Sequence, residues 1–342
     1  MKPKILFVVM SAVSKPSTID QLARSLAPHQ VLVHHDFSQT PDFALTAPNI
    51  IFVPAPKRTG WNFFGFVDGI FHAMQYALEK LDFDYLQLLS PSCLPIKPME
   101  DFELHLSGPA DAHFDCIDLL GDKDALMSVG YRVLTPGKSL RFRAARRLSN
   151  IYFGQLAGRR DEAGIWLRSG HAKSLLSRLA LLTIKTLSRK GIGRHIFDDK
   201  FRPYYGSVWF GARRHVVAGM VQGFLTPGVR DYFSQLCIAE EFLIPTLLMH
   251  LQPTKGPMNH FIKVFTHAHP GVFAEADMQE LASSSAFFAR KFPDDSLAPV
   301  RSRVLDELVE TDPFFSESKF FRAPPAAEPL RMGSPGLMNA MS

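Results

Sequence analysis

Short apolar runs alternate with amphipathic helical patterns along the first 120 residues of the chain. The apolar runs predict β-strands at 4–10, 31–34, 49–53, 85–89 and 112–117. Between them, Ser17 or Thr18 is a candidate N-cap for a helix that ends at Leu26, and apolar residues over 66–81 recur at helical spacing. Strands alternating with helices predict an α/β fold with a mostly parallel central sheet flanked by helices.

Sheets of this kind bind ligands beyond the carboxyl ends of their strands. The segments that follow the predicted strands are therefore candidate binding loops. They lie at 34–36, 54–61 and 90–97.

The later part of the chain differs in character from the first part. Residues 122–203 are basic and weakly periodic, which predicts an insertion of helices and loops. A second ordered stretch starts at 204, with a loop that enters a helix near 240, and 259–310 predicts a strand and helices at 276–281 and about 297–309. We expect one domain over 1–321 and a disordered tail at 322–342, which is rich in Pro, Ala, Gly and Met.

Basic charge is concentrated in one block of the sequence. The 342 residues carry a net charge of +5, and between Arg132 and Arg214 there are nineteen Lys or Arg but only four Asp or Glu. Such a block favours an anionic partner, which is a phosphate, an acidic glycan, a lipid headgroup or a nucleic acid. The alternative is a solvated helical face.

Several common classes of protein are excluded by missing patterns. No apolar stretch of about 18 residues predicts a membrane span, and Cys93, Cys116 and Cys237 form neither a disulfide framework nor a zinc site. Phosphate-loop, dinucleotide, zinc-protease and serine-hydrolase motifs do not occur. We expect a cytoplasmic protein whose basic block makes peripheral contact with the inner face of an anionic membrane.

The sequence gives little reason to expect a metal ion or any other cofactor. Its one Asp-x-Asp match, Asp82-Phe83-Asp84, precedes the strand at 85–89 instead of following it, which favours a helix-to-strand turn. His267 and His269 have ligand spacing, but no carboxylate or Cys lies near them in sequence, and a loop before Pro270 is the better interpretation.

Four segments together resemble the core-2/I-branching β-1,6-N-acetylglucosaminyltransferase and peptide O-xylosyltransferase family, as a bacterial-type member. They are VLVHHD ending at Asp36, LLSPSCLPIKP at 88–98, GSVWF at 206–210 with AEEF at 239–242, and FFARKF at 287–292. Their order and spacing fit that family over about 4–308. Two segments depart from it: Pro91-Ser92-Cys93 stands in place of Gly-x-Asp, and Trp61-Asn62-Phe63 in place of Trp-Gly-Gly. Both departures lie on the expected binding edge, where they bear on the choice of donor or acceptor.

The resemblance implies a GT-A-like fold and an inverting, metal-independent glycosyltransferase. Such an enzyme moves N-acetylglucosamine or xylose from a UDP-sugar to a hydroxyl of a glycan or glycolipid and forms a β-glycoside. The spelling of FFARKF favours the xylosyl branch. The resemblance also implies a nucleotide-sugar-binding half at 1–121 and an acceptor and catalytic half at 204–321.

Glu241 matches the catalytic base of the family, which accepts the proton of the acceptor hydroxyl. Arg290 and Lys291 match the basic residues that bind the donor diphosphate, where negative charge develops as UDP leaves. Each assignment has a plainer alternative. Glu240 and Glu241 are also typical of first-turn helix acids, and an Arg-Lys pair is typical of the solvent face of a strand.

Asp36 and Arg58 are assigned to nucleotide binding, and Ser207, Trp209 and Glu240 to the acceptor or donor sugar. An Asx turn is the alternative for Asp36. A Trp face suits the apolar side of a pyranose, but a core Trp is equally consistent with the sequence.

A function of another class remains open, which is a non-catalytic module that binds acidic glycans or nucleic acid through 132–214. Aromatic residues in this block offer stacking surfaces for bases. They are Tyr131, Phe142, Tyr152, Phe153 and Trp166. No RNA-module signature accompanies them.

Overall fold

The computed structural model describes residues 2–60, 63–137, 139–153, 158–160, 166–168, 174–192, 195–263, 265–266 and 269–310. Within these residues the main sheet has seven strands in the order β12-β6-β11-β4-β1-β2-β3. The strands are β1 (Ile5–Ser11), β2 (Gln30–His35), β3 (Ile50–Phe52), β4 (Tyr85–Leu89), β6 (Ala112–His113), β11 (Gly211–Arg213) and β12 (Lys255–Gly256). Only β11 runs antiparallel to its neighbours. The expectation of a mostly parallel sheet in an α/β fold is confirmed.

Apolar side chains cover both faces of this sheet. Along β1, Leu6 and Val8 belong to one apolar cluster, whereas Phe7 and Val9 belong to a second cluster on the other face. Helices α2 (Gly65–Lys80), α8 (Arg214–Leu225), α9 (Val229–Phe233) and α10 (Glu240–Leu251) contribute to the first cluster. The second takes residues from α1 (Pro16–Ser25), α3 (Met99–His105), α11 (Met278–Ser283) and α12 (Pro299–Val304). A continuous apolar run such as β1 is explained by burial on both sides.

Most elements expected in the first 120 residues are present, and two expectations are wrong in detail. Helix α1 starts at Pro16 with Lys15 as its N-cap residue, so Ser17 and Thr18 lie inside the first turn. Proline has a fixed φ that suits the first helical position, and this moves the start of the helix forward. The run at 112–117 is two strands, because the chain leaves the main sheet after β6 and β7 (Cys116–Asp118) pairs with β10 (Tyr204–Gly206).

A second, three-stranded sheet joins distant parts of the sequence. It has the order β13-β16-β5, with β13 at His260–Ile262, β16 at Phe288–Arg290 and β5 at Leu94–Pro95. The segments LLSPSCLPIKP and FFARKF are thereby neighbours: the Ile96 amide donates to the Phe287 carbonyl at 2.9 Å, and the Phe292 amide to the Ser92 carbonyl at 2.9 Å. The helices expected near 276–281 and 297–309 are confirmed as α11 and α12, and a π-helical turn at Leu305–Val309 extends α12.

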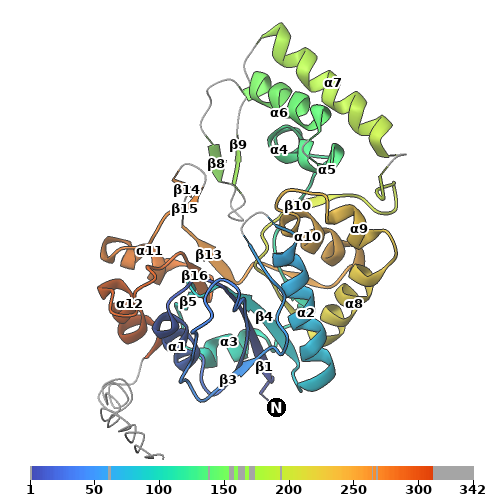
Figure 1. The fold of residues 1–342 in the computed structure, drawn as a ribbon. Helices are drawn as coiled ribbons and strands as arrows, with labels where there is room; N and C mark the ends of the chain where they lie inside the picture. The colour runs from blue at the N-terminus through green and yellow to red at the C-terminus, as the bar shows by residue number, and fades with distance from the viewer. Residues whose placement is uncertain are drawn as a thin grey trace, which may run out of the picture.

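The basic insertion forms a lobe that lies apart from the main sheet, at the top of Figure 1. Its elements are α4 (Lys123–Val129), α5 (Tyr131–Leu134), α6 (Leu140–Phe153), β8 (Gly158–Arg160), β9 (Trp166–Arg168) and α7 (Leu175–Ile192). A third apolar cluster holds the helices together and includes Ala145, Tyr152 and Phe153 of α6 with Ala180 and Ile184 of α7. A short β14 (Phe265–Thr266) and β15 (His269–Pro270) pair lies elsewhere in the chain.

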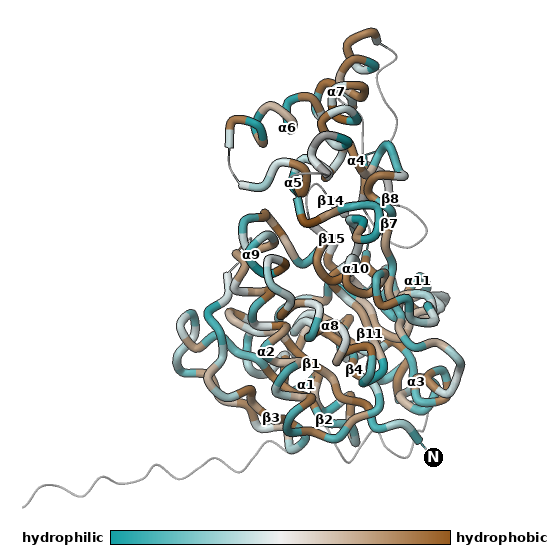
Figure 2. Tube along the Cα trace, turned by 90° about the vertical axis from the view of Figure 1, so that its right-hand side faces the viewer, coloured by the Kyte–Doolittle hydropathy of each residue, from teal (hydrophilic) through white to brown (hydrophobic). Residues whose placement is uncertain are grey.

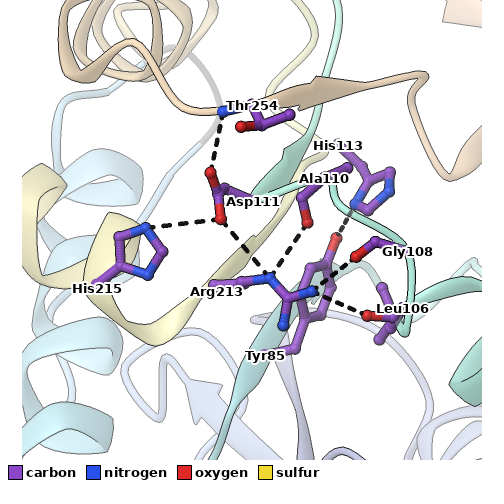
Figure 3. Close-up of polar contacts among 9 residues, drawn as sticks. All are labelled: Tyr85, Leu106, Gly108, Ala110, Asp111, His113, Arg213, His215 and Thr254. Carbon is purple, nitrogen blue, oxygen red and sulfur yellow. Dashed lines mark hydrogen bonds and ion pairs between the residues drawn. The ribbon is translucent and has the colours of Figure 1, made fainter.

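Some cations of the basic block are used inside the protein. Arg213, at the end of β11, donates to the carbonyls of Leu106, Gly108 and Ala110 at 2.9–3.2 Å and lies 3.7 Å from an oxygen of Asp111 (Figure 3). These bonds attach the loop after α3 to the main sheet. The guanidinium of Arg214 likewise donates to backbone carbonyls at the end of α2. The net charge of the block therefore overstates the charge that it offers to a partner.

Asp82 and Asp84 lie in the turn between α2 and β4, as expected. Asp82 forms an ion pair with Lys4, and the Lys4 amide donates to Asp84 at 2.8 Å. Both carboxylates are thus used at the amino end of β4, away from the carboxyl edge of the sheet. None of the described helices is long and apolar enough to cross a membrane. The tail at 322–342 and His267 lie outside the described residues, as does the side chain of His269.

Candidate active site

Two carboxylates begin helix α10. Glu240 and Glu241 occupy its first turn, and every residue from Phe242 to Leu248 behind them is buried. The helix therefore starts where the sequence predicts, and its exposed amide groups favour negative charge at this position. We call Glu240 and Glu241 the α10 carboxylate pair.

Glu241 is held by an arginine from the basic insertion. Its Oε2 accepts a hydrogen bond from Arg132 of α5 at 3.0 Å, and the Glu241 side chain is 31% exposed. The Arg132 guanidinium lies 4.9 Å from the ring centroid of Phe242 and 5.7 Å from that of Tyr205. Arg132 is itself only 8% exposed, so its ion pair with Glu241 fixes one carboxylate oxygen. Among the described residues, Oε1 of Glu241 accepts no hydrogen bond.

Glu240 has a different environment although it is adjacent. Burial raises the pKa of its carboxyl group to about 7, with a further contribution from the negative charge of Glu241. A carboxyl group with this pKa exchanges its proton near neutral pH, which suits acid–base chemistry. The two adjacent carboxyl groups thus have different surroundings, because Glu241 is paired with Arg132 and Glu240 has a pKa raised by burial.

A second cluster contains Trp209, His260 and Arg290, and we call it the Arg290 cluster. The Arg290 guanidinium lies 4.5 Å from the ring centroid of Trp209, and the His260 ring centroid lies 5.9 Å from that of Trp209. Burial and the charge of Arg290 lower the pKa of His260 to about 3, so the ring is neutral at physiological pH.

Three buried nitrogen atoms of this cluster lack a hydrogen-bond partner among the described residues. They are Nε of Arg290 and both ring nitrogens of His260. A buried donor without a partner costs about 1–3 kcal/mol. The half-buried Arg290 side chain and these nitrogen atoms make the Arg290 cluster a candidate site for an anion. Lys291 is the next residue after β16, and it is exposed.

The segment between β10 and β11 links the two clusters. In β10, the Tyr204 amide donates to Thr246 of α10 at 3.0 Å, and the Tyr205 ring packs on Phe242. Three residues beyond Gly206, the Trp209 ring contacts Arg290. The Ser207 hydroxyl accepts the Trp209 amide at 3.2 Å, which is a local turn contact. Trp209 is only 5% exposed, so the core interpretation describes its ring in this structure.

Asp36 and Arg58 lie in another group of loops, at the carboxyl ends of β2 and β3. Oδ1 of Asp36 accepts the amide and hydroxyl of Ser38 at 3.0 and 2.6 Å, and Oδ2 accepts Gln39 at 2.7 Å and the Thr59 amide at 2.6 Å. Burial opposes ionisation, but hydrogen bonds from Ser38, Gln39 and Thr59 hold the pKa of Asp36 well below its usual range. The Asx turn is present, and both carboxylate oxygens have protein donors.

These contacts of Asp36 position the loop that carries Arg58. The amide of Lys57 donates to His34 at 2.9 Å and that of Thr59 to Asp36 at 2.6 Å, so the backbone is fixed on both sides of the exposed Arg58 side chain. Gly65 packs under the same loop, where an added Cβ would lie 2.1 Å from the Arg58 carbonyl oxygen. Within the described part of the chain, no hydrogen bond or ion pair joins Asp36 or Arg58 to the α10 carboxylate pair or to the Arg290 cluster.

Sequence patterns do not identify two residues of the site. Arg132 is one of many cations in the basic block, and His260 belongs to none of the four segments. Two of the aromatic residues considered for base stacking have little or no exposed surface to offer a base. Tyr152 is 2% exposed and Phe153 is fully buried. The described residues contain no group of three or more His, Cys, Asp or Glu suited to hold a metal ion.

Comparison with known proteins adds no family to this picture. A scan against protein-family models finds no match to the chain, and a search of curated proteins finds no significant relative.

Proposed function

We propose that this protein is an inverting glycosyltransferase with a GT-A-like fold, which moves N-acetylglucosamine or xylose from a UDP-sugar to a hydroxyl of a glycan or glycolipid. The α10 carboxylate pair carries the proposal. One carboxylate is oriented by the buried Arg132, and the other has a pKa raised to about 7. The mostly parallel sheet and the resemblance in sequence support it.

In this proposal Glu241 is the catalytic base. Arg132 occupies its Oε2, which leaves Oε1 to accept the proton of the acceptor hydroxyl. As that proton moves, the acceptor oxygen forms a bond to the anomeric carbon, and the bond from that carbon to the UDP oxygen breaks with its electron pair. Attack from the face opposite UDP inverts the anomeric carbon and requires no covalent intermediate.

The Arg290 cluster is the proposed site for the leaving diphosphate. Arg290 has a buried Nε without a partner among the described residues, and Lys291 adds an exposed cation next to it. A fixed cation stabilises the charge that develops on the leaving group. Trp209 then acts by holding Arg290 in place and not by stacking on a sugar. Arg58, on its fixed loop, is proposed to contact the nucleotide.

The experiment is a panel of UDP-sugars tested for UDP release, with the wild type and Glu241→Gln. We expect at least one donor to be turned over and the variant to lose about 10²–10⁴ of the rate. Thermal stabilisation by UDP should stay unchanged, because Glu241 does not contact the proposed diphosphate site. Glu280→Gln, on the exposed face of α11, is the matched control and should keep full activity. More than about a tenth of the wild-type rate in Glu241→Gln would exclude Glu241 as the base.

A further inference from the structure

Helix α7 exposes its leucines. Five leucines are between 46% and 73% exposed, and they are Leu175, Leu176, Leu179, Leu182 and Leu187. The side chains that face the rest of the lobe are Ser177, Ala180, Ile184 and Ser188, all at most 4% exposed, and Leu181 packs beside them against the third cluster. The helix thus packs through a narrow stripe and leaves five of its leucines exposed.

The exposed leucines form one continuous face. At 3.6 residues per turn, they cover an arc of about 140° of the helix surface, together with Thr183 and Thr186. The exposed basic residues Arg178, Lys185 and Arg189 lie along one edge of this arc. An apolar face with a cationic edge is typical of helices that lie in the interface of a membrane.

The neighbouring helix adds to the positive charge. Helix α6 exposes Arg141, Arg143, Arg146 and Arg147, and α6 and α7 together carry eight basic residues and no Asp or Glu. The two helices lie side by side at the outer end of the molecule (Figure 1), and hydrophobic positions recur along α7 there (Figure 2). The five exposed leucines of α7 therefore lie at this outer end.

We propose that helices α6 and α7 form a docking surface for an anionic lipid bilayer, in which the leucines of α7 enter the headgroup region and the arginines of α6 bind lipid phosphates. Charge alone is consistent with several anionic partners. The leucines distinguish among them, because a bilayer buries apolar side chains next to phosphate groups, whereas nucleic acids and soluble acidic glycans mainly offer charge. The proposal does not depend on the catalytic role proposed for Glu241.

The test is flotation of the full chain with vesicles of phosphatidylcholine alone and of phosphatidylcholine with 30% phosphatidylglycerol. We expect binding only to the anionic vesicles. Leu179→Ser with Leu182→Ser should lower the partition coefficient at least about tenfold, because two leucines that are 50% and 62% exposed no longer enter the bilayer. Arg143→Ser with Arg147→Ser should lower it about fivefold for each arginine lost.

The controls separate lipid binding from unfolding and from self-association. Leu104→Ser with Leu297→Ser removes two leucines that are 74% and 80% exposed on other elements, and it should bind as the wild type does. Circular dichroism checks that each variant is folded. The proposal would be overturned if the protein did not bind anionic vesicles, or if Leu179→Ser with Leu182→Ser bound them as well as the wild type. It would also be overturned if the protein formed a dimer that covers the leucines and does not bind vesicles. Binding to single-stranded DNA or RNA but not to vesicles would assign the surface to nucleic acid instead.

Discussion

Helix α10 buries every residue from Phe242 to Leu248, whereas helix α7 leaves five leucines between Leu175 and Leu187 exposed. Both helices are rich in leucine. In α10 the apolar residues pack against the main sheet, and the acidic residues, Glu240 and Glu241, lie together at its start. In α7 the packing stripe is narrow, and the basic residues are distributed along the helix.

The two regions differ in how the surrounding structure holds their charges. Around α10, each charge has a fixed environment, as the ion pair of Glu241 with Arg132 and the stacking of Arg290 on Trp209 show. Few charges in a rigid frame suit chemistry on a small substrate. In α6 and α7, charges of one sign are exposed next to apolar side chains, which suits contact with an extended surface.

The largest expected effect is on the stability of the protein, and it differs between substitutions in the two helices. Leu248→Ala in α10 removes a side chain that is fully buried, and it should lower the free energy of unfolding by about 2–5 kcal/mol. Leu179→Ala in α7 removes a half-exposed side chain and should change it by at most about 0.5 kcal/mol. Urea unfolding of both variants measures the difference. Equal losses would mean that the leucine face of α7 is covered in the free protein.

The next largest effect is on the rate of the proposed sugar transfer when a basic residue is removed. Lys291→Ala should raise the transfer barrier by about 2–4 kcal/mol, because a cation next to the proposed diphosphate site is lost. Lys185→Ala, on the exposed edge of α7, is the matched control and should leave transfer to a water-soluble acceptor unchanged. Activity measured with EDTA should also be unchanged. If EDTA abolishes turnover and manganese restores it, the role assigned to Arg290 and Lys291 is wrong.

Much of the fold was accessible from the sequence, because local patterns determine it. Continuous apolar runs predict strands such as β1 and β4, and the acidic pair before Phe242 predicts the start of α10. Each of these signals lies within a few residues of the element that it predicts.

The rest of the site depends on contacts between distant residues. Arg132 and Glu241 are 109 positions apart, and no local pattern distinguishes this arginine from its basic neighbours. The burial of Trp209 depends on Arg290 and His260, which belong to other strands. On α7, hydrophobicity alone would place the leucines inside, but the lobe packs through Ala180 and Ile184 instead.

A smaller effect of about 3 kcal/mol or less should appear in the pH dependence of stability. Folding raises the pKa of Glu240 from 4.5 to about 7, so between these pH values the folded state binds more protons than the unfolded state. The free energy of unfolding should therefore fall as pH rises through this range, and it should fall less in Glu240→Gln, which cannot ionise. Urea unfolding of both proteins at pH 5 and pH 8 gives the comparison. A parallel decline in the two proteins would show that another group is responsible.

The smallest expected effect is on the stability of α6, and it shows whether the charges of this helix stabilise it. Arg143 and Arg147 are both exposed and lie four positions apart, so they repel each other, and the first turn of α6 contains no acidic residue. Arg143→Glu replaces this repulsion with a favourable i,i+4 pair and places a negative charge near the start of the helix. It should raise the free energy of unfolding by about 0.5 kcal/mol at low salt, and the gain should disappear in 1 M salt. Arg143→Gln, which removes only the repulsion, should gain less. A loss of stability in Arg143→Glu at low salt would mean that Arg143 has a partner within the protein, and the contrast with the fixed charges around α10 would not extend to this arginine.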